Sequence, residues 1–221
     1  MKRTMVALLL SAGLCGNALG MNYLGPPTTT MERDQWAVGA SYGYSEQDVH
    51  ANGVSSNEFR WQTALATIHL GVETNRAEVF GRVGVVGMQA VTGIEGGTDF
   101  AAGLGTRLTT DVGDTLSWGL AAQFLWWQAK DDLNDLNMFD IQIGLGPCWR
   151  PGSFLLYGGP LLHFVRGKGD RAGLDVYLSE GSWLAGYLGG GIDLNKHLMV
   201  TAEGQVTRDA FGLGFGVQWR F

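Results

Sequence analysis

The last eleven residues of the chain alternate strictly between large apolar side chains and small or polar ones. The apolar members are Phe211, Leu213, Phe215, Val217, Trp219 and Phe221. Successive side chains of a β-strand point to opposite faces, so the pattern predicts a strand with one apolar face and one small or polar face. Such a segment is long enough to cross a bilayer as a tilted strand. The alternative is an amphipathic edge strand of a soluble β-sandwich.

A similar pattern divides the chain from Gln35 onward into ten expected strands. They span roughly 35–44, 58–71, 77–87, 98–109, 115–128, 137–149, 153–165, 182–193, 197–206 and 210–221. In segments 115–128, 137–149 and 197–206 the apolar face carries no charge. A Lys or Arg at the middle of a bilayer would cost roughly 2–4 kcal/mol, so this absence indicates contact with hydrocarbon.

The connections between these segments alternate in length. Long polar connections cover 45–57, 88–97, 129–136 and 166–181, and short turns cover 72–76, 110–114, 150–152 and 194–196. Alternation of short turns and long loops is typical of transmembrane antiparallel up-and-down β-barrels, which have an even number of strands. We therefore predict an all-β barrel of ten strands. The connection near 207–209 is unusually short for a loop, so eight or twelve strands remain alternatives.

The tryptophans fall near the ends of the expected strands. An indole is apolar in body but donates a hydrogen bond, so it favours the boundary between membrane and water, whereas soluble cores tend to hold Trp in strand centres. This placement favours a membrane barrel. The expected interfacial residues are Trp36, Trp118 and Trp149 at one rim and Trp61, Trp126 and Trp183 at the other.

The terminal strand resembles that of Gram-negative outer-membrane β-barrels, which typically ends in Phe with another aromatic residue two positions earlier. Here those positions are Phe221 and Trp219, and Phe215 and Val217 share their face. The resemblance implies a signal that the barrel-assembly machinery reads, contact with outer-membrane lipids, and a bacterial outer-membrane location with both termini periplasmic. It implies nothing about activity.

The N-terminus has the features of a secretory signal. Lys2 and Arg3 precede an apolar run, and Ala18-Leu19-Gly20 forms a small-residue cleavage site. We expect residues 1–20 to be removed. Residues 21–34, rich in Thr and Pro, are expected to form an extended leader on the periplasmic side, where a protein partner could dock. Residues 35–221 are expected to form one barrel domain.

Composition excludes several function classes. The formal charge is −6, and loss of Lys2 and Arg3 with the signal would make it −8. An acidic chain is poorly suited to nucleic acid, whose binding depends on neutralising phosphates. Only Cys148 would remain after cleavage, so no intramolecular disulfide is expected. The acidic run 130–135 lacks the glycine and terminal Glu of a calcium loop, so we expect neither a metal nor a cofactor.

The inward faces of the expected strands carry polar and charged side chains. The expected lumen-lining residues are Arg82, Arg107, Gln123, Asp140, Gln142, Glu203, Gln205 and Arg220. Buried charges must pair, so the first interpretation is a structural ion-pair network, and the second is a polar path for small solutes. Many inward positions are glycine, which either leaves a water-filled lumen or lets a tightly curved sheet close.

An enzyme with its site at the outer rim is the competing class. Of the four histidines, His163 is the candidate to face a rim cleft, with Ser182, Asp175 or Glu180 as partners. No spacing matches a catalytic motif, and a packed or solvated histidine is the favoured interpretation, so we expect no catalytic residues. Three function classes follow: a structural or interaction protein, a narrow passive channel, and a rim hydrolase.

Overall fold

A computed structural model describes residues 22–51, 54–90, 95–130, 134–171, 174–180, 182–208 and 210–221. The strands are β1 (Trp36–Ala51), β2 (Val54–Glu73), β3 (Ala77–Ala90), β4 (Glu95–Asp111), β5 (Leu116–Lys130), β6 (Asn134–Trp149), β7 (Phe154–Arg171), β8 (Leu174–Glu180), β9 (Leu184–Asp193), β10 (Leu198–Thr207) and β11 (Ala210–Arg220). No helix long and apolar enough to cross a membrane occurs among the described residues. The expected signal, residues 1–20, and Met21 lie outside them.

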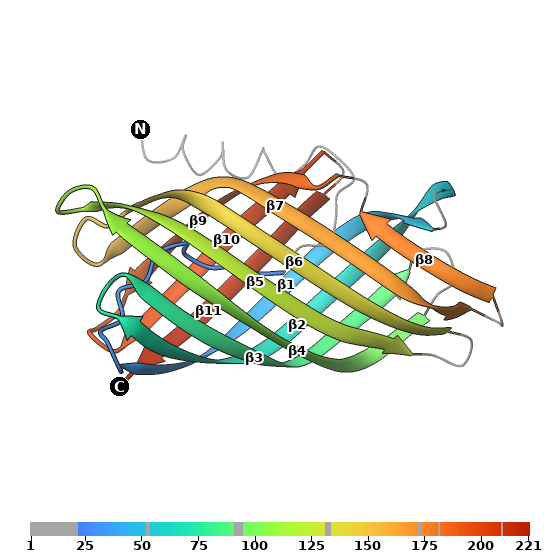
Figure 1. Cartoon of the computed structure of the whole chain (residues 1–221), viewed down its shortest axis with the longest axis horizontal. Coiled ribbons are helices and arrows are strands. Elements are labelled where there is room, and N and C mark those ends of the chain that lie inside the picture. Colours follow the sequence, from blue (N-terminus) through green and yellow to red (C-terminus); the bar gives the residue numbers. More distant parts are fainter. Residues whose placement is uncertain are drawn as a thin grey trace.

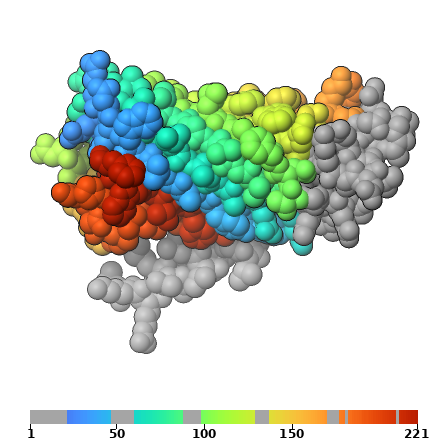
Figure 2. Space-filling view, turned by 90° about the horizontal axis from the view of Figure 1, so that it is seen from below, coloured from blue at the N-terminus to red at the C-terminus, as the bar shows by residue number. Residues whose placement is uncertain are grey.

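The strands form a closed antiparallel barrel. Strands that are neighbours in sequence pair with each other, except that β9 pairs with β7 and not with β8. The last strand, β11, pairs with β1 over eleven residue pairs from Ala37↔Arg220 to Gln47↔Ala210. Figure 1 shows the strands wrapping obliquely around a common axis, and Figure 2 shows the blue first strand beside the red last one. Ten strands make up the body, β1–β7 and β9–β11, which confirms the predicted fold class and count.

One end of the barrel has a different strand count from the body. The β10–β11 hairpin ends at Thr207 and Ala210, whereas β1 and β7 continue beyond it. There β8 pairs with β7 from Arg166↔Ser179 and with β1 from Val49↔Glu180. The sheet therefore closes as an eight-stranded collar beyond the hairpin. This explains the short connection at 207–209, because β8 takes the place that a longer hairpin would have filled.

The four predicted short turns lie together at the opposite end, beside Phe221. We call this the turn end, and the end with β8 the loop end. Asn75 and Gly152 adopt positive φ angles of 55° and 66° within two of these turns, the left-handed conformation that Asn and Gly tolerate best. At the loop end the strands run further than predicted, because segments 166–171 and 174–180, which the sequence pattern assigns to a long connection, pair as strands, the first of them although it lacks apolar alternation.

The outer surface of the barrel is apolar along its middle. Exposed large side chains there include Ile68, Val83, Leu104, Ile141, Leu145, Leu188, Phe215 and Val217. The predicted facing of β5, β6 and β10 agrees with the alternation of exposed and buried positions in these strands. A soluble protein rarely exposes so large a contiguous apolar area, so this belt is the lipid-facing surface of a transmembrane barrel.

Most of the predicted interfacial tryptophans point outward near the strand ends. Trp36, Trp118, Trp149 and Trp183 are exposed and Trp126 is half-buried. The prediction for Trp61 is wrong. Its side chain is 4% exposed and points into the barrel, because Trp61 falls on the inward parity of β2.

Candidate functional site: the occupied lumen

Residues that were expected to form a leader outside the barrel lie inside it. The segment from Asn22 to Met31, which we call the plug segment, runs through the lumen from the turn end, and every residue in it except the half-buried Thr30 is buried. Only Glu32, Arg33 and Asp34 are exposed before β1 begins. The expectation of a free leader is wrong because the inner wall offers this segment both polar partners and space.

The wall holds the plug segment mainly through its backbone. The Glu203 carboxylate accepts hydrogen bonds from the backbone N–H of Leu24 at 3.0 Å and of Gly25 at 3.1 Å. The Arg82 guanidinium donates to the carbonyl oxygens of Tyr23 at 2.7 Å and of Leu24 at 3.4 Å. Hydrogen bonds to charged groups are the stronger class, so these two opposite charges fix the segment from both sides.

Two glutamines and an aspartate complete the contacts at the deep end of the plug segment. Gln205 donates to the carbonyl oxygen of Asn22 at 3.0 Å, and the Asn22 amide donates to the Asp140 carboxylate. Gln123 donates to the carbonyl oxygen of Tyr23 at 3.3 Å and to Gln142 at 2.7 Å. Buried polar groups need such partners, because an unpaired one costs free energy.

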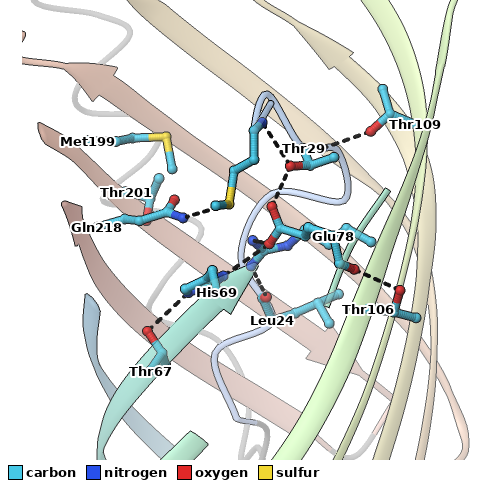
Figure 3. A network of polar contacts seen from close by, with 12 residues as sticks. Leu24, Thr29, Thr67, His69, Glu78, Thr106, Thr109, Met199, Thr201 and Gln218 are labelled. Carbon is cyan, nitrogen blue, oxygen red and sulfur yellow. Dashed lines mark hydrogen bonds and ion pairs between the residues drawn. The ribbon is translucent and has the colours of Figure 1, made fainter. Parts of the chain in front are cut away.

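A second network fixes the plug segment near the turn end (Figure 3). Glu78 is its centre: Arg107 donates to Glu78 Oε1 at 2.5 Å, His69 Nδ1 lies 3.0 Å from the same oxygen, and the Thr29 hydroxyl donates to the other carboxylate oxygen. Thr29 N–H also donates to the Thr109 hydroxyl at 2.8 Å. The network therefore ties the segment to β3 and β4.

The order Thr67, His69 and Glu78 resembles a hydroxyl–imidazole–carboxylate relay. His69 Nε2 lies 3.0 Å from the Thr67 hydroxyl. Such an order can activate a nucleophile. Here Glu78 is also occupied by Arg107 and Thr29, and the plug segment covers the site, so the arrangement acts as an anchor.

Glycines on the inner wall leave the space that the plug segment fills. A Cβ at Gly214 or Gly216 would lie 2.7 Å or 2.5 Å from Tyr23, and one at Gly144 would lie 2.5 Å from the Leu24 side chain. A Cβ at Gly119 would lie 2.4 Å from the Pro27 carbonyl oxygen. The glycine-rich inner face therefore forms a groove for the plug segment instead of a water-filled lumen.

Beyond the plug segment, an apolar layer closes the lumen towards the loop end. It consists of Trp61, Leu65, Val86, Ala101, Leu125, Trp127, Met138, Val165 and Leu178, all buried. The indole rings of Trp61 on β2 and Trp127 on β5 meet edge to face with their centroids 5.4 Å apart. These strands are separated in the sheet by β3 and β4, so the contact reaches across the lumen and not along the wall.

The lumen is closely filled where plug segment and wall meet. A cavity of about 20 Å³ lies there among Tyr23, Thr67, Thr201 and Gln218, with room for about one water molecule. The plug segment and the apolar layer are thus two closures in series along the barrel axis.

The structure places seven of the predicted lumen residues, from Arg82 to Gln205 in the chain, on the buried inner wall. The eighth, Arg220, lies at the turn end, where its guanidinium is 3.5 Å from Asp193, which also pairs with Arg150 at 2.6 Å. The four residues of the expected assembly signal, Phe215, Val217, Trp219 and Phe221, point outward from the end of the chain.

His163 does not lie in a rim cleft. It is 1% exposed and sits in the lumen, with Nε2 3.2 Å from Asp140 Oδ1. The Ser182 hydroxyl lies 3.5 Å from the carbonyl oxygen of Leu184. The side chains of Asp175, of Glu180 and of the acidic run 130–135 fall outside what the structure describes. His163 is therefore a packed histidine, as the favoured interpretation of the sequence had it, and the alternative of a rim cleft is wrong, because His163 falls on the inward parity of β7.

Comparison with known proteins gives likenesses of fold only. No family model matches the chain, and no curated protein matches it. The chain resembles Gram-negative outer-membrane β-barrels in structure.

Three solved structures illustrate the resemblance. The translocator domain of the autotransporter NalP from Neisseria meningitidis is 12% identical, with a TM-score of 0.48 over 100% of this chain and 94% of that one. The outer-membrane protease OmpT from Escherichia coli is 12% identical, with a TM-score of 0.47 over 88% and 98%. The attachment invasion locus protein Ail from Yersinia pestis is 16% identical, with a TM-score of 0.43 over 86% and 100%. At these values no role is transferred.

Sequence reasoning missed two parts of this site. Glu78 and His69 were not proposed as lumen residues, although both lie on inward positions of β3 and β2. The plug segment carried one usable clue, since its ten residues contain no charge while the lumen residues that surround it do. A segment that has no charged side chains and directly precedes the strands around a charged lumen is a suitable occupant of that lumen.

Proposed function

We propose that this chain is an integral protein of the bacterial outer membrane with a structural or anchoring role, whose barrel its own N-terminal segment closes to solutes. The observation that carries the proposal is the double filling of the lumen, by residues 22–31 and by the apolar layer around Trp61 and Trp127. A barrel that conducted small polar solutes would need a continuous wet path, and the charged wall residues instead bind the plug segment.

Other roles receive less support from this geometry. A partner that gripped residues 21–34 from the periplasm would first have to extract the plug segment, because only residues 32–34 of the described leader are exposed. A hydrolase with its active site at the rim would need catalytic groups other than His163, because His163 is buried in the lumen. The proposed anchoring role depends instead on the loop end, where the strands of the collar, β1–β8, extend beyond the β10–β11 hairpin.

Conductance measurements test the closed barrel. We expect the purified, folded wild-type protein to show no discrete conductance steps in planar bilayers, because two separate parts of the lumen are filled. A known open porin reconstituted in the same bilayers is the positive control. Reproducible single-channel steps from the folded wild-type barrel would contradict the proposed function.

We further propose that the turn end faces the periplasm, since short turns in such barrels lie on that side and longer extensions lie outside. A membrane-impermeant maleimide added to intact cells should label Gln128→Cys, near the loop end of β5, and should leave Gly113→Cys, in a turn, unlabelled. A Cβ at Gly113 would meet no atom within 4 Å, so we expect the substitution to be tolerated. The reverse labelling pattern would show the opposite orientation.

A further inference from the structure

We infer that the lumen is a one-ended receptor for an extended polypeptide segment without charged side chains, and that residues 22–31 are its resident and exchangeable occupant. The partner that fits is therefore a segment of another chain with an aromatic–aliphatic pair followed by glycine, entering from the turn end. The inference rests on the proposed function, because a receptor with one opening requires that the far end of the lumen stay closed.

The chemistry of recognition is that of a peptide-binding site. Glu203 accepts from two consecutive backbone N–H groups, and Arg82 donates to the two carbonyl oxygens of Tyr23 and Leu24. Arg107 adds a third donor, 3.3 Å from the Leu24 carbonyl oxygen. These contacts are hydrogen bonds to backbone groups, so they are available to any segment that takes the same path.

Side-chain recesses restrict which segment fits. Tyr23 packs against Gly214 and Gly216, and its hydroxyl hydrogen bonds with Thr201. Leu24 is fully buried in a cluster with Ala121, Tyr157, Leu161 and Tyr187, among others. The following residue is Gly25, whose φ of 83° is a conformation that side chains disfavour. The wall therefore selects for an aromatic residue, an aliphatic residue and a glycine in succession.

A charged segment would be disfavoured in this groove. The plug segment contributes no ionic side chain. Glu78 is paired with Arg107, and Glu203 and Arg82 bond to backbone groups of the segment. An added charge would be buried without a partner, which is costly in a low-dielectric interior.

The β-sheet does not need the plug segment for its backbone hydrogen bonds between strands. None of the residues 22–31 belongs to a strand, and β1 closes directly on β11. The segment leaves the lumen at the turn end, where Met31 accepts a hydrogen bond from Asn75 N–H at 2.8 Å and the exposed residues 32–34 follow. It can therefore be separated from the sheet by a single cut in an exposed stretch.

The covalent connection between the plug segment and β1 explains why this segment would occupy the lumen in preference to a free one. A short covalent connection gives the resident segment an effective concentration on the order of millimolar, so a free segment competes poorly while the chain is intact. A partner segment would bind when the resident one is withdrawn or cleaved.

The test uses the full chain with a recognition sequence for a specific protease inserted after Arg33. The protein is folded, reconstituted in detergent micelles and cut, and a fluorescent peptide with the sequence of residues 22–31 is added. We expect saturable uptake of this peptide, measured by fluorescence anisotropy, at least tenfold stronger in the cut protein than in the uncut one.

Matched variants identify the site of uptake. Glu203→Gln and Gly216→Val should each weaken uptake at least tenfold. The first removes the negative charge and replaces one of the two oxygens that accept from backbone N–H groups by an amide donor, and the second fills the recess of Tyr23. Gly204→Val is the control and should leave uptake unchanged, because a Cβ at Gly204 points outward and first meets Leu213, at 3.8 Å. A peptide carrying Leu24→Asp or Gly25→Ala should bind at least tenfold more weakly than the natural sequence.

Two failures are distinguishable. If the cut protein stays folded and silent in planar bilayers but takes up no peptide, or if uptake ignores Glu203→Gln and Gly216→Val, the receptor inference is overturned and the closed barrel stands. If the cut protein conducts as its segment leaves, the apolar layer does not close the far end and the one-ended receptor is overturned, whereas the proposed function is overturned only if the uncut wild-type barrel conducts.

Discussion

Deleting residues 22–31 is expected to leave the barrel silent in planar bilayers, and discrete conductance is expected only when Trp61→Ala and Trp127→Ala are added to the deletion. The reason is that the two closures lie in series. Removing the plug segment opens a water-filled pocket at the turn end, but the apolar layer still spans the lumen through the contact of the two indoles. Removing the indoles alone leaves the plug segment in place.

This prediction has a matched control in the outward tryptophans. Trp118→Ala and Trp149→Ala, combined with the same deletion, should not conduct, because both side chains face away from the lumen. Retention of the folded barrel is checked by the heat-dependent shift in electrophoretic mobility. Conductance from the deletion alone would mean that the apolar layer does not seal, and conductance from the tryptophan variants alone would mean that the plug segment does not.

Arg107→Ala is expected to destabilise the folded barrel by about 3–5 kcal/mol, the usual cost of removing one partner from a buried ion pair. Glu78 would keep only His69 and Thr29, and the Leu24 carbonyl oxygen would lose one donor. The side chains of Arg107 and Glu78 are 5% and 2% exposed, so water does not replace the lost partner while the plug segment stays in place. The measurement is the free energy of unfolding in urea, followed by tryptophan fluorescence.

The exposed pair of Arg76 and Glu73 at the same end of the barrel provides the comparison. Their side chains are 69% and 62% exposed at a separation of 3.5 Å, so Arg76→Ala should cost only about 0–1 kcal/mol. Adding Glu78→Gln to Arg107→Ala should recover part of the loss, since it removes the uncompensated charge. Equal effects of Arg107→Ala and Arg76→Ala would refute the buried network as an anchor.

The two closures suggest different roles for the halves of the lumen. The half towards the loop end is packed like the core of a soluble protein, with aliphatic side chains and two indoles. The half towards the turn end combines charged wall residues with the apolar cluster around Leu24, and it holds a segment that no strand includes. The half towards the loop end would then hold the barrel rigid, and the half towards the turn end would bind an exchangeable segment. Both properties are compatible with an anchoring protein that also receives a partner.

The alternation of side chains was sufficient to predict the barrel. Because successive strand residues face opposite sides, the terminal segment from Phe211 to Phe221 and segments such as 137–149 identify the lipid-facing side without knowledge of any contact. The count of ten followed from these segments together with the alternating short and long connections between them. The same parity rule, applied to Trp61 and His163, would have placed both inside, but the irregular alternation of 58–71 and 153–165 obscured it.

The path of residues 22–31 could be decided only by the tertiary structure. Their sequence has no period, and the groups that bind them come from β3, β4, β5, β6 and β10, which are brought around one axis by closure of the sheet. The collar formed by β8 likewise depends on pairing with β1, more than a hundred residues away. Local patterning therefore determined which face of each strand meets lipid, whereas long-range closure determined what fills the space inside, because that space exists only once the last strand has paired with the first.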